Sequence, residues 1–278
     1  VQGYKNDKGS FWGLSCTYRE GNKCMTPSYA YKIVSKEDEY PVRLGKKSLR
    51  MELRKGDCHQ KRKGSHNDCK ASPPAERHEF GIEYDKLTGI KGERWHSHSM
   101  FLPSDTPVIN SEWITMGQFH NIDYHKPPVN FDLKNNHFEL VTRFHCIHPK
   151  KFNKTCYSNE NSEAIKKIID TSKLFGQWND FVVNANWTSD MKKGFFKLWV
   201  NGELVYHFVG RTVAPDDQLT VQFGIYRGKA RSSGDANHVI FYDEIRSAKS
   251  CKKMKLSQLG YSCKDLENQK INKIYRLQ

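Results

Sequence analysis

The stretch TVQFGIYRGK, residues 220–229, decides the fold because apolar and polar side chains alternate along it. Successive side chains of a β-strand point to opposite faces, so one face carries the apolar set Leu219, Val221, Phe223 and Ile225. The other face carries Thr220, Gln222, Gly224 and Tyr226. The apolar face is typical of packing in a sheet. A glycine beside a tyrosine on the other face suits the close approach of a ligand.

Two further stretches place polar side chains on one side of a predicted strand. In residues 113–120 (WITMGQFH), Gln118 and His120 share a side, and in residues 76–80 (ERHEF), Arg77 and Glu79 share one. If these strands belong to one sheet, an arginine, a glutamine, a histidine and a tyrosine form a site that binds an anion and moves protons.

Short strand-like stretches recur along the whole chain, and Asn201-Gly202 between two of them is the strongest short hairpin signal. A single short helix is predicted after Ser162, with the apolar stripe Ala164, Ile165, Ile168 and Ile169. This pattern predicts an all-β fold, a jelly roll of the concanavalin-like two-sheet sandwich type. We expect one domain over residues 1–278, with an outer strand and loops in 1–45 and a basic tail in 246–278.

The chain is strongly basic, with 45 Lys and Arg against 31 Asp and Glu and a formal net charge of +14. This balance favours an anionic partner, although a basic surface that only maintains solubility explains it as well. No run approaches the roughly 18 apolar residues of a membrane span. No nucleic-acid-binding signature is present either. We therefore expect an acidic polymer as the partner, rather than a membrane or a nucleic acid.

Eight cysteines lie in four close pairs, and none forms the C-x-x-C spacing of a zinc site. Other pairings are open, but the local grouping favours disulfide-stapled loops closed by Cys16–Cys24, Cys58–Cys69, Cys146–Cys156 and Cys251–Cys263. Two glycosylation sequons, at Asn153 and Asn186, point to the same oxidising compartment. We expect a secreted glycoprotein that begins at Val1 after removal of a targeting segment.

The polar residues of the three strands match the needs of β-elimination in a uronate polymer. The C5 proton becomes acidic when the uronate carboxylate is neutralised, which Arg77 and Gln118 suit. His120 suits the base and Tyr226 the acid that protonates the leaving oxygen, and their roles can be exchanged. This chemistry requires no metal. Each residue also has a purely structural explanation, and only their joint placement favours the catalytic one.

Four segments resemble the jelly-roll polysaccharide lyases of the heparin lyase I and glucuronan lyase group. They are RHEF (77–80) for the family's R-T-E-L, HSMFLPSDTP (98–107) for F-S-x-Y-I-P, GQFH (117–120) for A-Q-W-H, and FGIYR (223–227), which repeats the family's motif. Residues 178–202 also resemble the strands that precede the last motif. The resemblance covers about residues 48–245.

The resemblance implies an endo-acting lyase with His120 and Tyr226 as the proton-transfer pair and Arg77 and Gln118 at the uronate carboxylate. The other expected substrate-binding residues are Arg50, Arg54, Glu79, Gln222 and Arg227. Gln222 replaces a lysine of heparin lyase I, which argues against sulfated heparin and leaves glucuronan, alginate and ulvan open. Neighbouring alginate lyases have a similar residue set.

Further expectations from the resemblance concern metals, association and loops. No cofactor is required, but some members bind calcium, for which Asp216 and Asp217 are the candidate ligands; two adjacent acids are also explained by a turn. We expect a monomer. The loop of residues 55–74 has no counterpart in the family that we can place.

Two other classes of protein fit parts of this pattern. A non-catalytic carbohydrate-binding module or lectin needs the basic, aromatic face but not the pair His120 and Tyr226. A retaining glycoside hydrolase needs two carboxylates about 5 to 5.5 Å apart. On sandwiches of this kind they usually lie on an E-x-D-x-E strand, which this chain lacks.

Overall fold

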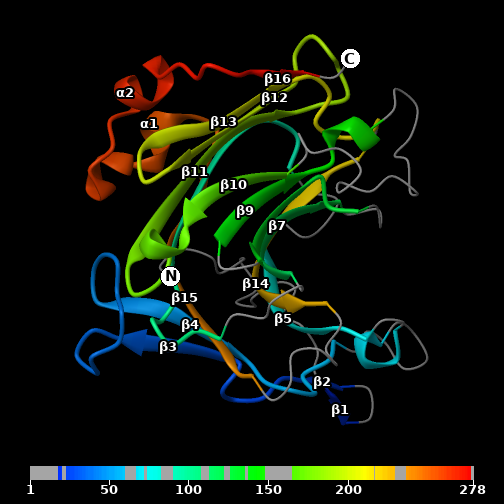
Figure 1. The fold of residues 1–278 in the computed structure, drawn as a ribbon, viewed down its shortest axis with the longest axis vertical. Helices are drawn as coiled ribbons and strands as arrows, with labels where there is room; N and C mark the ends of the chain where they lie inside the picture. Colours follow the sequence, from blue (N-terminus) through cyan, green and yellow to red (C-terminus); the bar gives the residue numbers. More distant parts are fainter. Residues whose placement is uncertain are drawn as a thin grey trace.

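Two β-sheets pack face to face around a common apolar core in the computed structural model (Figure 1). The model describes residues 18–20, 23–59, 67–71, 74–82, 90–107, 113–121, 126–134, 137–147, 165–215, 217–228 and 236–276. The prediction of an all-β, two-sheet jelly roll is confirmed. Among the helices of the described residues, none is long and apolar enough to cross a membrane.

The six-stranded sheet has the order β10 (Ile165–Asp170), β9 (His137–Thr142), β8 (Val129–Lys134), β7 (Ile114–Asn121), β14 (Leu219–Arg227) and β5 (Glu76–Ile82). The eight-stranded sheet has the order β16 (Tyr275–Arg276), β13 (Glu203–Val209), β12 (Phe195–Val200), β11 (Trp178–Trp187), β6 (Gly92–Phe101), β15 (His238–Ala248), β4 (Lys47–Leu53) and β3 (Tyr31–Ser35). A separate hairpin pairs β1 (Tyr18–Glu20) with β2 (Lys23–Met25).

The core lies between the two sheets and is built by the apolar face of each strand. On β14 the buried side chains are Leu219, Val221, Phe223 and Ile225, as the alternation predicts. Phe181 of β11 meets Phe131 and Phe138 of the opposite sheet, with ring centroids 5.7 and 5.6 Å apart. Burial of one such side chain contributes about 1.5 to 3 kcal/mol, so the two sheets are stable only together.

Strand β14 is irregular at Gly224, where its register with β7 shifts between Phe223 and Tyr226. A Cβ atom on Gly224 would lie 2.1 Å from the carbonyl oxygen of His78 on β5, and the glycine has a φ of +142°. The glycine therefore serves the close approach of a neighbouring strand, rather than the approach of a ligand that the sequence suggested. This is a correction to the role expected for it.

The hydroxyl of Tyr242 crosses the core from β15 to this irregular point. Its single hydrogen points between the backbone carbonyls of Met116 and Gly224, and its oxygen accepts from the Gly224 backbone N–H. Tyr242 is fully buried. Backbone groups that the bulges leave without a ladder partner are thus hydrogen-bonded inside the core, where an unpaired polar group is costly.

The predicted helix after Ser162 is wrong within the described residues, because Ile165–Asp170 forms the edge strand β10 paired with β9. The register shifts between Lys167 and Ile169. This bulge breaks the strict alternation of apolar residues, so their spacing resembles that of a helix. Ser162 and Ala164 lie outside the described residues. The hairpin at Asn201-Gly202 is confirmed, and both residues have positive φ, 50° and 86°.

The C-terminal segment covers the outer face of the eight-stranded sheet. It contains α1 (Cys251–Met254), a 3₁₀ turn (Leu256–Leu259) and α2 (Cys263–Asn268), which lie beside β12 and β13 in Figure 1. Its apolar side chains pack on a stacked tryptophan pair, Trp95 and Trp199, whose centroids are 5.6 Å apart. The expected bridge Cys251–Cys263 is confirmed.

The other predicted bridges fall partly outside the described side chains. Cys58 and Cys146 are each disulfide-bonded. The side chains of Cys16, Cys24, Cys69 and Cys156 lie outside the described part of the chain, so these three pairings stay predictions.

Replacing Gly224 by Ala is expected to destabilise the fold by about 3 kcal/mol or more, because the new Cβ would collide with the backbone of β5. Gly117 on the adjacent strand is the matched control. A Cβ there meets Phe131 Cδ2 at an ordinary 3.5 Å, so Gly117→Ala should cost less than about 1 kcal/mol. Urea unfolding of both variants measures the difference. Equal stability of the two variants would contradict this account of β14.

Candidate active site

Three neighbouring strands carry the five polar residues proposed to act on the uronate, and these lie on the outer face of the six-stranded sheet: Arg77, Glu79, Gln118, His120 and Tyr226. Directly paired residues of adjacent strands project to the same side. Gln222 of β14 pairs with Gln118 of β7, Tyr226 of β14 pairs with Arg77 of β5, and Thr220 of β14 pairs with His120 of β7. The opposite face of the same strands is the core face.

Arg77 is held from two sides. Its Nε and Nη2 atoms donate to both carboxylate oxygens of Asp68, at 2.5 and 3.0 Å, and its Nη1 lies 3.4 Å from Glu79 Oε2. The guanidinium carbon also lies 3.9 Å from the centre of the Tyr226 ring. Asp68 is buried in a 3₁₀ turn (Asp68–Lys70) of the loop that precedes β5. The arginine head group therefore has a fixed orientation beside the tyrosine.

A chain of amide and carboxyl groups connects the middle of the three strands. Nε2 of Gln118 donates to Glu79 Oε1 at 2.7 Å and to Gln222 Oε1 at 2.9 Å. Gln118 is 3% exposed and Glu79 is 5% exposed. Burial raises the pKa of Glu79, although Arg77 and Gln118 work in the opposite direction.

His120 and Tyr226 lie on either side of this amide pair along the strands. His120 Nδ1 is 2.6 Å from the backbone carbonyl of Asn121. A carbonyl can only accept, so Nδ1 carries the proton and the lone pair of the neutral ring lies on Nε2. This is the tautomer in which Nε2 can take a proton. His120 is half-buried on the same face as Gln118.

Tyr226 is packed between an indole and a guanidinium. Its ring meets Trp113 edge-on, with centroids 5.2 Å apart, and Arg77 covers it. Burial raises the pKa of Tyr226, and the cation of Arg77 lowers it. The phenol thus stays protonated at neutral pH and retains a proton that it can donate.

Comparison with known proteins identifies the family of this chain. The family model described as polysaccharide lyase matches residues 26–246. The chain belongs to the polysaccharide lyase family. It is a polysaccharide lyase, which also confirms the family resemblance found in the sequence. A search of curated protein sequences gives no match.

Solved structures share the fold of this lyase at low sequence identity. The endo-β-1,4-glucuronan lyase of the fungus Trichoderma reesei is 15% identical, with a TM-score of 0.53 over 85% of this chain and 94% of the other. The alginate lyase PA1167 of Pseudomonas aeruginosa is 12% identical, with a TM-score of 0.50 over 86% of this chain and 98% of the other. At these identities the likeness concerns the fold alone.

Two of the three arginines expected to bind substrate in this lyase, Arg227 and Arg50, lie away from the face that carries Gln118 and Tyr226. Arg227 is 1% exposed on the core side of β14, where its Nε donates to Glu76 and its Nη1 contacts His238 Nδ1 at 2.9 Å. Arg50 lies on the outer face of the eight-stranded sheet, and its guanidinium shares Glu52 with that of Arg54. Substrate binding by these arginines stays a prediction, and Arg227 is the one whose placement is set by the strand itself. The reason for Arg227 is that the alternation continues through it, which places it beside Ile225 on the core face.

The described residues contain no cluster of side chains that could bind the calcium ion expected from the resemblance. Asp216 lies outside them. Asp217 is buried, and its Oδ1 accepts a hydrogen bond from the backbone N–H of Gln218 at 2.8 Å. Within the described part of the chain no group of three or more His, Cys, Asp or Glu side chains is arranged to hold a metal ion.

The sequence analysis missed a polar cluster on the adjoining strand β8. Asp132 accepts from Thr115 Oγ1 at 2.6 Å, and Thr115 accepts from Asn130 Nδ2 at 3.2 Å. Burial raises the pKa of Asp132 to about 6. The alternation in residues 129–134 (VNFDLK) could have placed Asn130 and Asp132 on the site face. Asp68, in contrast, lies in a loop with no periodic signal.

Proposed function

We propose that this lyase is a secreted, endo-acting enzyme that cleaves a uronate-containing acidic polysaccharide by β-elimination. The observation that supports this most directly is the placement of His120 and Tyr226 on one sheet face, on either side of the pair Gln118 and Gln222. The similar folds are those of a glucuronan lyase and an alginate lyase, whose names specify uronate polymers. Disulfide bonds at Cys251–Cys263 support an oxidising compartment.

In the proposed mechanism the uronate lies over the amide pair. Arg77 hydrogen-bonds its carboxylate, and Gln118 does so by exchanging its contact with Gln222 for one with the substrate. Both donors stabilise the enolate-like charge that develops when the C5 proton leaves. His120 takes this proton on Nε2, and Tyr226 donates its phenolic proton to the leaving glycosidic oxygen. Where the C5 proton faces the tyrosine instead, Tyr226 acts as the base only after it has given up its phenolic proton, with Arg77 as counter-charge, and a protonated His120 then supplies the proton to the leaving oxygen. The C–O bond breaks and the electron pair of the C5–H bond forms the new double bond.

Asp68 is the positioning residue of this mechanism. Its two contacts take up Nε and Nη2 of Arg77, so the orientation of the guanidinium is set before substrate binds. The neighbouring Glu79 has a raised pKa and holds Gln118 from the other side. The raised pKa of Glu79 favours the neutral carboxyl more than in an exposed glutamate, which suits a site that must accept an anion.

Gln222 places an uncharged amide between His120 and Tyr226, where heparin lyase I has a lysine. Its carbonyl oxygen accepts from Gln118, which leaves the amide nitrogen as a donor for a substrate oxygen. A neutral donor can bind a hydroxyl or a carboxylate oxygen, but it offers no full charge for a sulfate group. We therefore infer that the sugar at this position carries a carboxylate without a sulfate ester.

Replacing His120 by Ala or Tyr226 by Phe is expected to lower turnover by about 10² to 10⁴ fold each, because each variant loses one proton-transfer group. The ultraviolet absorbance of the unsaturated product follows the reaction on glucuronan, alginate, ulvan and heparin. His207→Ala on β13 and Tyr40→Phe are the controls, since both side chains lie on the other sheet or its connections. If the wild-type protein binds these polymers but cleaves none, it is a carbohydrate-binding module.

Replacing Asp68 by Asn should lower kcat about tenfold with a smaller change in KM, because the guanidinium of Arg77 loses its orientation. Loss of the buried ion pair also lowers stability, so the melting temperature is recorded and kinetics are measured well below it. Asp68→Glu keeps the charge and is expected to restore part of kcat. Unchanged kcat in a folded Asp68→Asn enzyme would remove Asp68 from the mechanism.

Replacing Gln222 by Lys should raise kcat/KM for a sulfated uronate polymer, relative to an unsulfated one, by about tenfold, since a cation then faces the sulfate. Gln222→Glu is the matched variant. It adds a negative charge at the same place and should weaken binding of both polymers. If the wild-type enzyme and Gln222→Lys have the same ratio of kcat/KM for sulfated and unsulfated polymer, the neutral side chain at position 222 is not the source of specificity.

A further inference from the structure

A strongly basic surface lies on the side of the molecule opposite the candidate active site. Residues 249–276 contain eight Lys and Arg and only two acidic residues, Asp265 and Glu267. The balance of +6 is a large share of the net charge of +14 in a tenth of the chain. The segment begins after residue 246, where the match to the family model ends.

The lysines of this segment are displayed by a fixed scaffold. Met254, Leu256, Leu259 and Leu266 are buried against the eight-stranded sheet, whereas all seven lysines of the segment are exposed. Five of them lie close to the disulfide bridge in the sequence: Lys249, Lys252, Lys253, Lys255 and Lys264. We call these five the basic cap. The bridge Cys251–Cys263, with a Cα–Cα distance of 5.8 Å, holds Lys252 next to Lys264, although twelve residues separate them.

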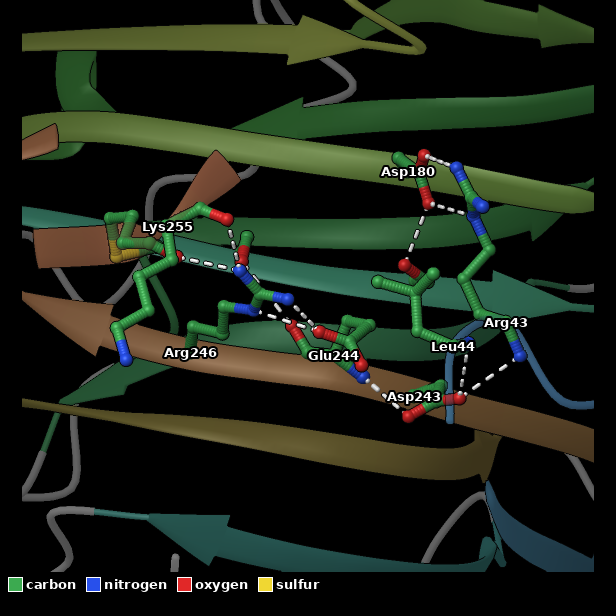
Figure 2. A network of polar contacts seen from close by, with 10 residues as sticks. Arg43, Leu44, Asp180, Asp243, Glu244, Arg246 and Lys255 are labelled. Carbon is green, nitrogen blue, oxygen red and sulfur yellow. Dashed lines mark hydrogen bonds and ion pairs between the residues drawn. The ribbon is translucent and has the colours of Figure 1, made fainter. Parts of the chain in front are cut away.

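Further hydrogen bonds fix the segment to the sheet. Arg246 Nη1 donates to the backbone carbonyls of Met254 and Lys255, both at 2.7 Å, as Figure 2 shows for Lys255. Trp199 Nε1 donates to the Leu266 carbonyl at 3.2 Å. The hydroxyl of Tyr261 donates to Asp180 at 2.7 Å. A mobile basic tail would lose entropy on binding, but this one is already ordered.

Among the described residues, the charges of the basic cap have no ion-pair partner. No ion pair between described residues involves any of its five lysines. Of the acidic side chains near the cap, Glu244 is paired with Arg246, whereas Asp265 and Glu267 are exposed on α2. Exposed lysine side chains without intramolecular partners, held close together, produce a local positive potential that attracts a polyanion.

We propose that the basic cap is a second binding surface for acidic polysaccharide, which holds the enzyme on the polymer that it cleaves. This rests on the proposed function, since the partner is the substrate class itself. Flexible lysines bind a repeating anionic chain as point charges, without a demand for one sugar geometry. Because the core separates the cap from the catalytic face, the cap binds a distant part of the chain or a neighbouring chain.

Two sites on one molecule raise the effective concentration of the polymer at the catalytic face only when the polymer is long or forms a gel. Short oligosaccharides cannot reach both faces. The cap should therefore affect turnover of a gel and leave turnover of oligosaccharides unchanged. This difference separates a polysaccharide-binding surface from a basic surface that only maintains solubility.

The test compares two triple variants with the same change in charge. Lys252→Glu/Lys253→Glu/Lys264→Glu alters the cap and leaves Lys255 in place, because its backbone binds Arg246. Lys36→Glu/Lys46→Glu/Lys47→Glu is the control, at exposed lysines of the β3–β4 hairpin. Binding to alginate and glucuronan beads is measured in proteins that also carry His120→Ala and Tyr226→Phe, so that no cleavage interferes.

The cap variant is expected to bind the beads about tenfold more weakly at low salt, and the control variant within about twofold of the parent. In the active enzyme, the cap variant should lose about five- to tenfold in rate on gel particles and keep its kcat/KM on short oligosaccharides. If the active enzyme cleaves no uronate polymer but the cap variant still binds the beads more weakly, the basic cap is retained as a binding surface. The proposed substrate of the lyase is then rejected.

Two outcomes would overturn the proposal. One is equal bead binding by the cap variant, the control variant and the parent. The other is a loss that is confined to anionic lipid vesicles or duplex DNA, with bead binding unchanged, which would assign the surface to a membrane or to a nucleic acid.

Discussion

The candidate active site depends on the contact between the Tyr242 hydroxyl and the bulged backbone of β14 and β7. With an unbroken two-residue alternation, β14 and β7 would pair in a regular ladder without bulges. The bulges at Gly224 and near Met116 leave backbone groups without ladder partners, and the fully buried phenol on β15 hydrogen-bonds them. The eight-stranded sheet thereby fixes the register of the six-stranded sheet. That register decides which side chains of β7 lie beside Gln222 and Tyr226.

The electrostatic problem of the site is to bind an anion where carboxylates are already buried. Arg77 is the one cation among the described residues of the network, and it faces both Asp68 and Glu79. An arrangement with both acids ionised would repel a uronate. Burial raises the pKa of Glu79. The guanidinium of Arg77 compensates the negative charge of Asp68 through two hydrogen bonds. The two acids therefore have different roles: Asp68 orients the arginine, and Glu79 holds the amide of Gln118.

The sequence predicts the faces of this fold well because strand periodicity is a local property. It placed Val221 and Phe223 in the core and Gln118, His120 and Tyr226 on one outer face. It could not predict contacts that arise from non-local pairing. Asp68 reaches Arg77 only through a loop, and Gly224 is required by the backbone of another strand. The same limit explains β10, where a bulge imitates the spacing of a helix.

The rigidity of the C-terminal segment comes from a polar network and not from its short helices. Asp180 on β11 accepts from Arg43 (Figure 2) and also from Ser99 and Tyr261, so one carboxylate joins the loop after β3, the sheet and the segment. Burial alone would raise the pKa of Asp180, but these donors lower it. A helix of four residues such as α1 is unstable alone. The basic cap is therefore ordered because the sheet beneath it supplies both an apolar surface and a charged anchor, which ties its geometry to the same sandwich that positions His120 and Tyr226.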